Sequence, residues 1–145
     1  MAIFSILKEF SAAQTIATQT ANDSTNILDL GANGDSLVKR GVVHVQVNTA
    51  FATSASGTLT VTIQTCATVG GSYTTLWTSA AAIAVGTLVA GYKITGKDGI
   101  PLPSGVLRYL KVVYTVNTGA MSAGKCDAWL SNAEGGDSNK FTVAL

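Results

Sequence analysis

Residues 57–66 have the sequence GTLTVTIQTC, and this stretch decides the fold class. Leu59, Val61 and Ile63 alternate with polar residues, so every second side chain is apolar. Successive side chains of a β-strand point to opposite faces, and this period of two predicts a strand with one face in the core and the other toward solvent. The preceding small residues at 52–57, ATSASG, predict a hairpin loop back to an earlier strand.

The same alternation recurs on both sides of this stretch. Within residues 41–49, Val43, Val45 and Val47 share one face, and a polar set that includes His44 occupies the other. Residues 107–116 form a long and strongly predicted strand, whose core face carries Leu110, Val112, Tyr114 and Val116. Further strands are expected at residues 26–30, 73–78 and 122–131, and turn residues separate them. The chain is therefore predicted to be all-β, as a jelly roll or β-sandwich of about eight strands in one domain spanning residues 1–145.

Residues 80–105 are harder to assign. The alanine-rich residues 80–85 are too few to nucleate a helix, and residues 87–95 are expected to form a strand or an extended segment. Residues 100–105, IPLPSG, contain two prolines that remove ladder donors, and a stiff loop outside any sheet is predicted there.

The two ends of the chain are expected to lie outside the sandwich. Residues 1–12 are predicted to form an extended N-terminal arm that leaves an unusual amount of apolar surface in water, with Phe4 and Phe10 as anchors on another subunit. The alternative is that the arm folds back as an edge strand of its own sheet. Residues 132–145 are polar at first and predict a C-terminal tail, whose last six residues, KFTVAL, could add to a sheet edge or fray.

Charge and hydropathy exclude several classes of partner. The net charge is +1 and only 12% of residues are charged, so no field attracts nucleic acid or an anionic membrane. No apolar run is long enough to span a bilayer, and no basic n-region precedes the first apolar residues, so secretion is not expected. Such low charge favours a surface that meets other protein, or else an exterior that is merely rich in Thr and Ser.

The two cysteines are expected to stay unpaired. Cys66 continues a polar alternation, whereas Cys126 falls in register with small and apolar residues, so the two strands point them to different environments. Free thiols in a reducing cytoplasm follow from this arrangement.

No catalytic, metal or cofactor site is predicted. The single histidine, His44, lies in mid-strand, and the cysteines lack the short spacings of zinc sites. Asp29, Asp35 and Asp98 occupy positions typical of turns or strand ends. Lys39 and Arg40 are the only adjacent basic residues, and they could meet an acidic patch on a protein partner or remain solvated.

Several stretches together resemble one family of viral proteins. They are residues 9–14 (EFSAAQ), 24–31 (STNILDLG), 59–65 (LTVTIQT), 89–92 (VAGY), 100–103 (IPLP), 108–116 (RYLKVVYTV) and 122–125 (SAGK). In this order they resemble the jelly-roll capsid cement, or head decoration, proteins of tailed bacteriophages. The resemblance covers most of residues 9–131, and the tail beyond Ser131 is longer than the family pattern.

The resemblance implies a non-enzymatic protein of the virion, made in the host cytoplasm, that binds the outer capsid surface and bridges neighbouring major capsid proteins. It implies no cofactor, and its partners are the major capsid protein and a second or third copy of the chain, not nucleic acid or membrane. The expected partner-interface residues are Ile3, Phe4, Leu7, Phe10, Lys39, Arg40 and Trp129.

Two other functional classes are weighed against this one. A carbohydrate-binding, lectin-like jelly roll would use Trp77 and Trp129 as sugar platforms, and it requires exposed rings that cluster beside a groove. An enzyme built from Asp29, Asp35 or Asp127 requires two of these carboxylates in one cleft.

Overall fold

The structure, a computed structural model, describes residues 9–16, 21–30, 41–53, 55–80, 82–103 and 105–131. These residues form strands joined by turns and loops, which confirms the all-β class, and none of their segments is a helix able to cross a membrane. The strands are β1 (Glu9–Thr15), β2 (Ala21–Asp23), β3 (Leu28–Asp29), β4 (Val42–Thr53), β5 (Thr58–Cys66), β6 (Thr74–Thr78), β7 (Ile83–Ala84), β8 (Ile100–Pro101), β9 (Tyr109–Asn117) and β10 (Met121–Ser131).

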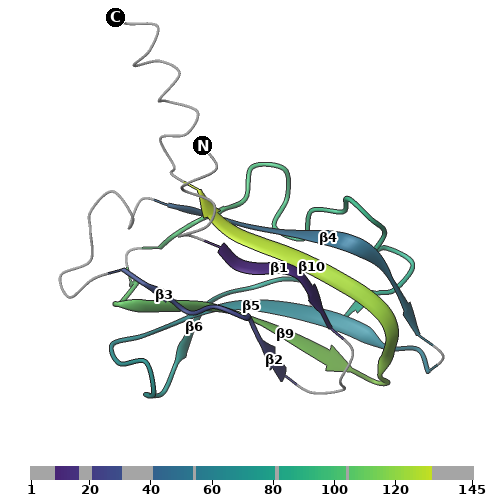
Figure 1. The fold of residues 1–145 in the computed structure, drawn as a ribbon, viewed down its shortest axis with the longest axis horizontal. Coiled ribbons are helices and arrows are strands. Elements are labelled where there is room, and N and C mark those ends of the chain that lie inside the picture. Colours follow the sequence, from purple (N-terminus) through teal and green to yellow (C-terminus); the bar gives the residue numbers. More distant parts are fainter. Residues whose placement is uncertain are drawn as a thin grey trace, which may run out of the picture.

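Two antiparallel sheets lie face to face as a sandwich (Figure 1). The four-stranded sheet has the order β1-β10-β4-β8. The six-stranded sheet has the order β2-β9-β5-β6, and β3 and β7 pair with β9 and β5 respectively. The structure has more strands than the predicted eight because β3, β7 and β8 are pieces of only two residues.

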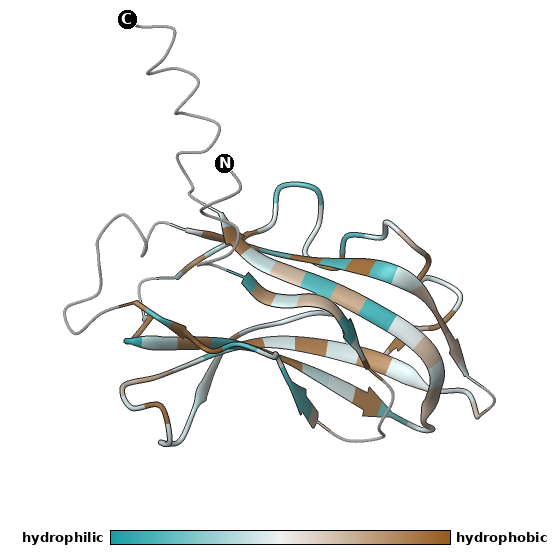
Figure 2. Ribbon diagram, viewed as in Figure 1, coloured by the Kyte–Doolittle hydropathy of each residue, from teal (hydrophilic) through white to brown (hydrophobic). Residues whose placement is uncertain are grey.

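The core lies between the sheets, where the predicted alternation places it. Val43, Val45 and Val47 of β4 are fully buried, and so are the predicted inward residues of β5 and β9. Figure 2 shows the resulting change between hydrophobic and hydrophilic residues along these strands. Each buried Val, Leu or Ile side chain contributes about 1.5–3 kcal/mol, so these three strands supply a large part of the folding free energy.

The predicted hairpin between β4 and β5 is wrong, because these strands belong to different sheets. β4 continues to Thr53, and the connection then crosses the edge of the sandwich. The Thr53 hydroxyl organises this crossing, since it accepts hydrogen bonds from the backbone N–H groups of Ala55 and Gly57 at 3.1 Å each and donates one to the carbonyl of Ala120 at 2.8 Å. Small turn-prone residues identify a turn, but they do not identify the sheet that it enters.

The sandwich begins at Glu9, inside the N-terminal arm predicted for residues 1–12. Glu9–Thr15 forms β1, the edge strand that pairs with β10, so the alternative of an edge strand holds for residues 9–12, while residues 1–8 lie outside the described residues. Phe10 is fully buried in the core, and its carbonyl accepts a hydrogen bond from the Asn26 N–H at 2.9 Å. The prediction that Phe10 anchors a partner is therefore corrected, because its ring packs in the core of its own sandwich.

The segment that contains the prolines also differs from its prediction. Ile100–Pro101 forms β8, opposite Val43 and Val42 of β4. Proline is tolerated there because β8 is a two-residue edge strand, where a missing N–H donor breaks no central ladder. The Leu102 N–H closes this contact by donating to the Gly41 carbonyl at 3.0 Å.

Residues 87–95 form turns rather than the predicted strand. They run along the free side of β4 and bond to it through the backbone. The Val47 N–H donates to the Tyr92 carbonyl at 2.8 Å, and Lys93 bridges to Gln46. Gly91 and Gly96 have positive φ angles of 89° and 80°, and such turns prevent a regular strand.

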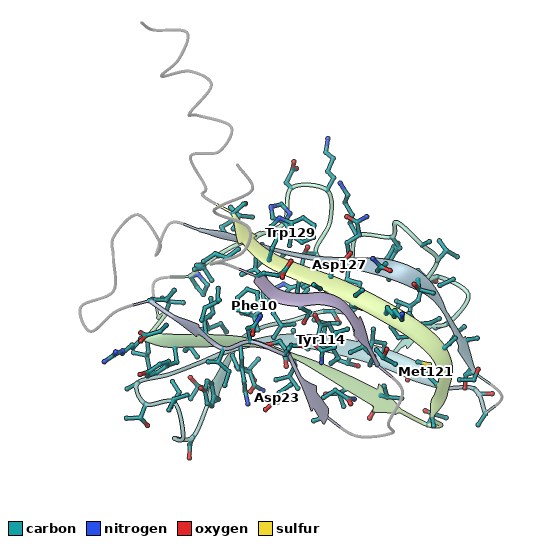
Figure 3. The ribbon with its side chains drawn as sticks, viewed as in Figure 1. Phe10, Asp23, Tyr114, Met121, Asp127 and Trp129 are labelled. Carbon is teal, nitrogen blue, oxygen red and sulfur yellow. The ribbon has the colours of Figure 1, made fainter. Side chains whose placement is uncertain are left out.

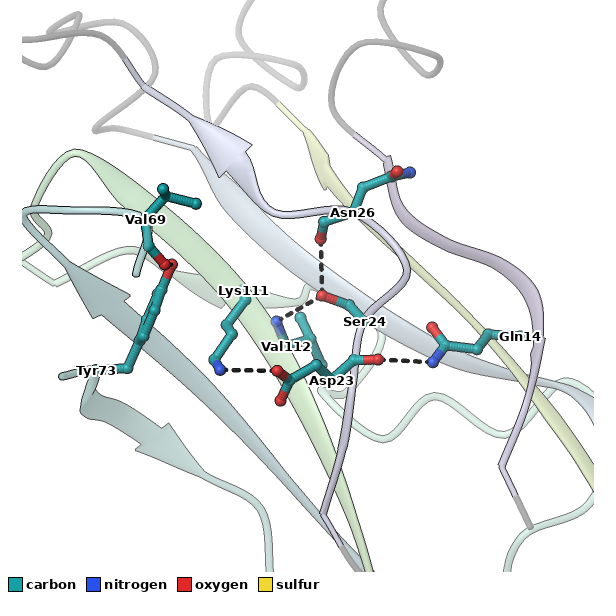
Figure 4. A network of polar contacts seen from close by, with 8 residues as sticks. All are labelled: Gln14, Asp23, Ser24, Asn26, Val69, Tyr73, Lys111 and Val112. Carbon is teal, nitrogen blue, oxygen red and sulfur yellow. Dashed lines mark hydrogen bonds and ion pairs between the residues drawn. The ribbon is translucent and has the colours of Figure 1, made fainter. Parts of the chain in front are cut away.

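A polar network attaches β2 to β9 (Figure 4). The Ser24 hydroxyl accepts a hydrogen bond from the Val112 N–H at 3.2 Å and donates one to the Asn26 carbonyl at 2.8 Å. The Lys111 ammonium pairs with the Asp23 carboxylate at 3.0 Å and lies 4.3 Å from the centre of the Tyr73 ring. These contacts hold a strand of only three residues at the edge of its sheet.

Both cysteines are unpaired, as predicted, but both are buried, although the alternation places Cys66 on the polar face of its strand. Cys126 belongs to the core between the sheets, and burial, with a smaller contribution from Asp127, raises the pKa of its thiol to about 12. Cys66 ends β5 and lies beside Thr68, with 4.0 Å between its sulfur and the Thr68 hydroxyl.

Candidate functional site

Trp129 lies on the outward face of β10, which is flanked by β1 and β4 (Figure 3). Its neighbours Ala128 and Leu130 are buried, so the alternation turns the indole away from the core, where it is half-buried. The strand register pairs Trp129 directly with His44 of β4. The two rings stack with 5.2 Å between their centres and 14° between their planes.

His44 is held in place from three sides. Its Nε2 lies 3.0 Å from the Ser131 hydroxyl, and the Trp129 ring covers one face. A Cβ atom built on Gly99 would lie 2.8 Å from His44 Cε1, so the loop that follows Lys93 comes close only because residue 99 is a glycine with φ of +72°. Burial lowers the pKa of His44, Lys93 lowers it further, and Asp98 opposes both. The neutral imidazole is therefore favoured in the folded protein.

Asp127 links three strands of the same sheet. Its carboxylate accepts a hydrogen bond from the Ala13 N–H of β1 at 2.6 Å and another from the Asn48 amide of β4 at 3.0 Å. Ala13 has a φ of 48° and sits at an irregular point of the β1 ladder, where its N–H is turned toward the carboxylate. Asp127 therefore has a structural role, because it fixes β1 to the sheet.

The ends of three strands meet beside the stacked rings. Glu9 at the start of β1 pairs with Trp129, and Ser131 at the end of β10 pairs with Val42 at the start of β4. We call the surface formed by Glu9, Val42, His44, Trp129 and Ser131 the Trp129 end of the four-stranded sheet.

Three segments of the sequence join the described fold at or next to this Trp129 end. Residues 1–8 precede Glu9, residues 31–40 precede Gly41, and residues 132–145 follow Ser131. All three lie outside the described residues, and they contain most of the predicted partner residues, namely Ile3, Phe4, Leu7, Lys39 and Arg40. The structure thus places the attachment points of these residues together at one end of one sheet, while Phe10 is excluded from the set because it is buried.

A comparison with models of known protein families shows the family of the chain. The family model described as Bbp16 matches residues 10–130. The chain belongs to the Bbp16 family. The matched region of this Bbp16 family member begins inside β1 and ends inside β10, and it includes both His44 and Trp129. No curated protein matches the chain.

The two tryptophans of this Bbp16 family member do not form a common platform. Trp77 belongs to β6 of the six-stranded sheet and packs against the core, whereas Trp129 belongs to the other sheet. A lectin-like site requires exposed rings beside one groove. The structure separates the two rings that the lectin alternative needs.

The described carboxylates are also separated. Asp29 of β3 receives two hydrogen bonds from the Arg108 guanidinium, at 2.8 and 2.9 Å, on the six-stranded sheet. Asp127 lies on the other sheet, and Asp35 lies outside the described residues. Within the described part of the chain no group of three His, Cys, Asp or Glu residues could hold a metal ion.

Sequence reasoning missed the partners of these side chains. The alternation placed His44 on the polar face of residues 41–49, but it did not indicate that this face is continuous with the face of residues 122–131 that carries Trp129. The missing information was the pairing of β4 with β10, which are separated by a long stretch of sequence. An aromatic and a histidine on outward faces of two long strands is the only local signal of such a contact.

Proposed function

We propose that this protein is a non-enzymatic component of a tailed-phage virion that binds the outer capsid surface and joins neighbouring major capsid proteins. The family name Bbp16 suggests a phage-related protein, which supports the assignment of this chain to a phage. The resemblance of residues 9–131 to capsid cement proteins supports the more specific role.

The observation that carries the proposal is that three segments join the described fold at or next to the Trp129 end. Their attachment points Glu9, Gly41 and Ser131 lie at the strand ends beside one half-buried indole, and the sequences of the segments include apolar residues at 1–8 and basic residues at 31–40. Interfaces combine a central aromatic anchor with a charged rim, and extended segments enlarge the area that one small domain can cover. The Trp129 end has the chemistry of such an interface.

Cementing requires buried area and multiplicity rather than chemistry. A single contact of about 1,000 Å² is weak, but an oligomer that grips several capsid proteins at once gains a high effective concentration at each further contact. We therefore propose the major capsid protein and further copies of this chain as partners, with no cofactor, nucleic acid or membrane. The site of action is the capsid exterior, after synthesis in the host cytoplasm.

Sedimentation with phage heads tests the proposal. Heads assembled without this protein are mixed with the purified chain and pelleted. We expect the protein to pellet in a fixed ratio to the major capsid protein and to saturate. A protein that stays in the supernatant at all concentrations would refute the cementing role.

A pair of variants locates the interface in the same experiment. Trp129→Ala removes the proposed anchor, and a loss of about 2 kcal/mol corresponds to roughly 30-fold weaker binding to heads. Val89→Ala is the matched control, since Val89 is an exposed apolar residue (52%) in the loop that bonds to Val47, outside both the Trp129 end and β6. Equal binding of both variants and the unmodified protein would show that the Trp129 end is not the contact.

A further inference from the structure

Charge is distributed unevenly along this chain. Residues 45–92 contain no Asp, Glu, Lys, Arg or His, although the protein has nine basic and eight acidic residues. This uncharged stretch contains all of β5, β6 and β7. A surface exposed only to water gains solubility from charge, so an uncharged third of the sequence requires an explanation.

The described charges of the six-stranded sheet lie on one half of it, and the uncharged stretch also includes residues 45–53 of β4 in the other sheet. On the six-stranded sheet the cations Arg108 and Lys111 are paired with Asp29 and Asp23, at 2.8 and 3.0 Å, and both pairs lie at β9 and its neighbours β2 and β3. The half of this sheet formed by β5, β6 and β7 has no charge. The other described charged residues belong to the four-stranded sheet or its loops, and they are Glu9, Lys93, Lys97, Asp98, Lys125 and Asp127.

The described edge strands differ in how they are protected from pairing with another chain, and β3 and β7 have only two residues each. β1 has two register shifts and an Ala13 N–H bound by Asp127, β2 has only three residues and ends in Asp23, and β8 has two residues including Pro101. Charge, proline, bulges and short length are the devices that keep an edge from adding a strand. β6 has one register shift, but its sequence TTLWT contains neither charge nor proline.

Exposed apolar side chains accompany this edge. Val69, in the turn before β6, is 55% exposed, and Leu107 is 45% exposed. Leu107 donates its N–H to the hydroxyl of Thr65, which pairs with Thr74 at the start of β6. Apolar surface thus lies at the end of the strand that is least protected by charge.

We propose that a second copy of this chain docks on β6, so that the two β6 strands pair antiparallel about a two-fold axis. A two-fold interface pairs residue i with residue j and residue j with residue i, so residues close to the axis lie near their own copies. A charged residue close to the axis would therefore face a like charge. The uncharged stretch removes this repulsion, which is an argument for self-pairing rather than for pairing with an unrelated strand. The inference refines the self-association that forms part of the proposed function, and it leaves the Trp129 end of the other sheet open to the capsid.

Charge placed on β6 tests the pairing in solution, without phage heads. Thr75 is exposed on β6, and Thr75→Lys or Thr75→Glu brings like charges together across the axis. We expect the unmodified protein to be a dimer by sedimentation equilibrium, and each variant alone to dissociate at least about tenfold more readily. An equimolar mixture of the two variants restores the dimer, because Lys then faces Glu, and this recovery also shows that both variants are folded.

A matched control and a second measurement complete the test. Ala50→Lys introduces the same charge on an exposed position of β4 in the other sheet and leaves the dimer unchanged. Amide hydrogen exchange in residues 74–78 slows as the protein concentration rises through the dissociation constant. A monomeric or trimeric unmodified protein, or a Thr75→Lys variant as dimeric as Ala50→Lys, would overturn the inference. If a monomeric protein binds heads, the β6 pairing is refuted and the proposed capsid binding stands. If the protein dimerises through β6 but does not bind heads, the proposed capsid binding is refuted and the β6 pairing stands.

Discussion

The Tyr114 hydroxyl donates a hydrogen bond to the Ser11 hydroxyl at 3.0 Å, across the interior of the sandwich. Tyr114 (Figure 3) belongs to β9 of the six-stranded sheet. Ser11 belongs to β1 of the four-stranded sheet. Tyr114 is fully buried and burial raises the pKa of its phenol, so the bond remains formed at every physiological pH. Ser11 in turn donates to the Gln14 side chain at 2.6 Å. This chain of hydroxyls joins the two sheets at the edge strand β1.

Removing the acceptor and removing the donor of this hydrogen bond should lower the free energy of unfolding by different amounts. Ser11→Ala leaves the buried Tyr114 hydroxyl without an acceptor and should destabilise the fold by about 1–3 kcal/mol. Tyr114→Phe removes the hydroxyl itself and should cost about 1 kcal/mol, because Ser11 keeps its bond to Gln14. Urea unfolding of both variants and of the double variant measures the difference. Equal, additive costs would show that the bond contributes nothing.

Phe10→Ala should destabilise the domain by about 3–5 kcal/mol, because it opens a cavity where a fully buried ring packs between the sheets. The loss is measured by thermal and urea unfolding. Val89→Ala, at a residue that is 52% exposed, is the apolar control and should change stability by less than about 1 kcal/mol. A Phe10→Ala protein of normal stability that fails to bind heads would restore Phe10 as a partner anchor.

Deletion of residues 2–8 should separate partner binding from folding. The described sandwich begins at Glu9, and the proposal assigns the apolar residues before it to the capsid or to another subunit. We expect the shortened protein to keep its unfolding midpoint and to lose affinity for heads. A large fall in the midpoint with unchanged head binding would place these residues in the fold instead.

The stability of the protein should depend on pH through His44. Its pKa is lowered in the folded protein, chiefly by burial, so the unfolded state binds the proton more readily. The contribution of His44 to the free energy of unfolding is complete above about pH 7. It is lost as the pH falls below the ordinary histidine pKa of about 6.5. The difference in urea midpoint between pH 7.5 and pH 5.5 should shrink in His44→Gln. A histidine titration by NMR with a midpoint above 6.5 would contradict the prediction.

The thiol of Cys126 should be protected from alkylation while the protein is folded. Cys126 lies in the core with a pKa raised to about 12, so little thiolate forms and alkylation should be very slow. After unfolding, intact mass should show two alkylated cysteines without prior reduction. A mass with neither thiol modified after unfolding would indicate a disulfide.

The sequence alone determined the fold class and the core faces of the long strands. Alternation of period two identified β4, β5 and β9 together with their buried residues, because a strand exposes opposite faces at successive positions wherever it lies. The alternation also placed Cys126 with the small and apolar residues of its strand, and Trp129, an odd number of positions away, lies on the opposite, outward face. These properties depend on residues that are close in sequence, so a local pattern is enough to predict them.

Only the tertiary structure decided which strands are neighbours. The pairing of β4 with β10 rather than β5, the entry of residues 9–12 into the sheet and the stacking of His44 on Trp129 all follow from it. Backbone hydrogen bonds between strands use N–H and C=O groups that nearly every residue shares, so they carry no sequence signature. The neighbour of each strand is therefore selected by how the buried faces of distant segments fill one core together, and no local pattern records that fit.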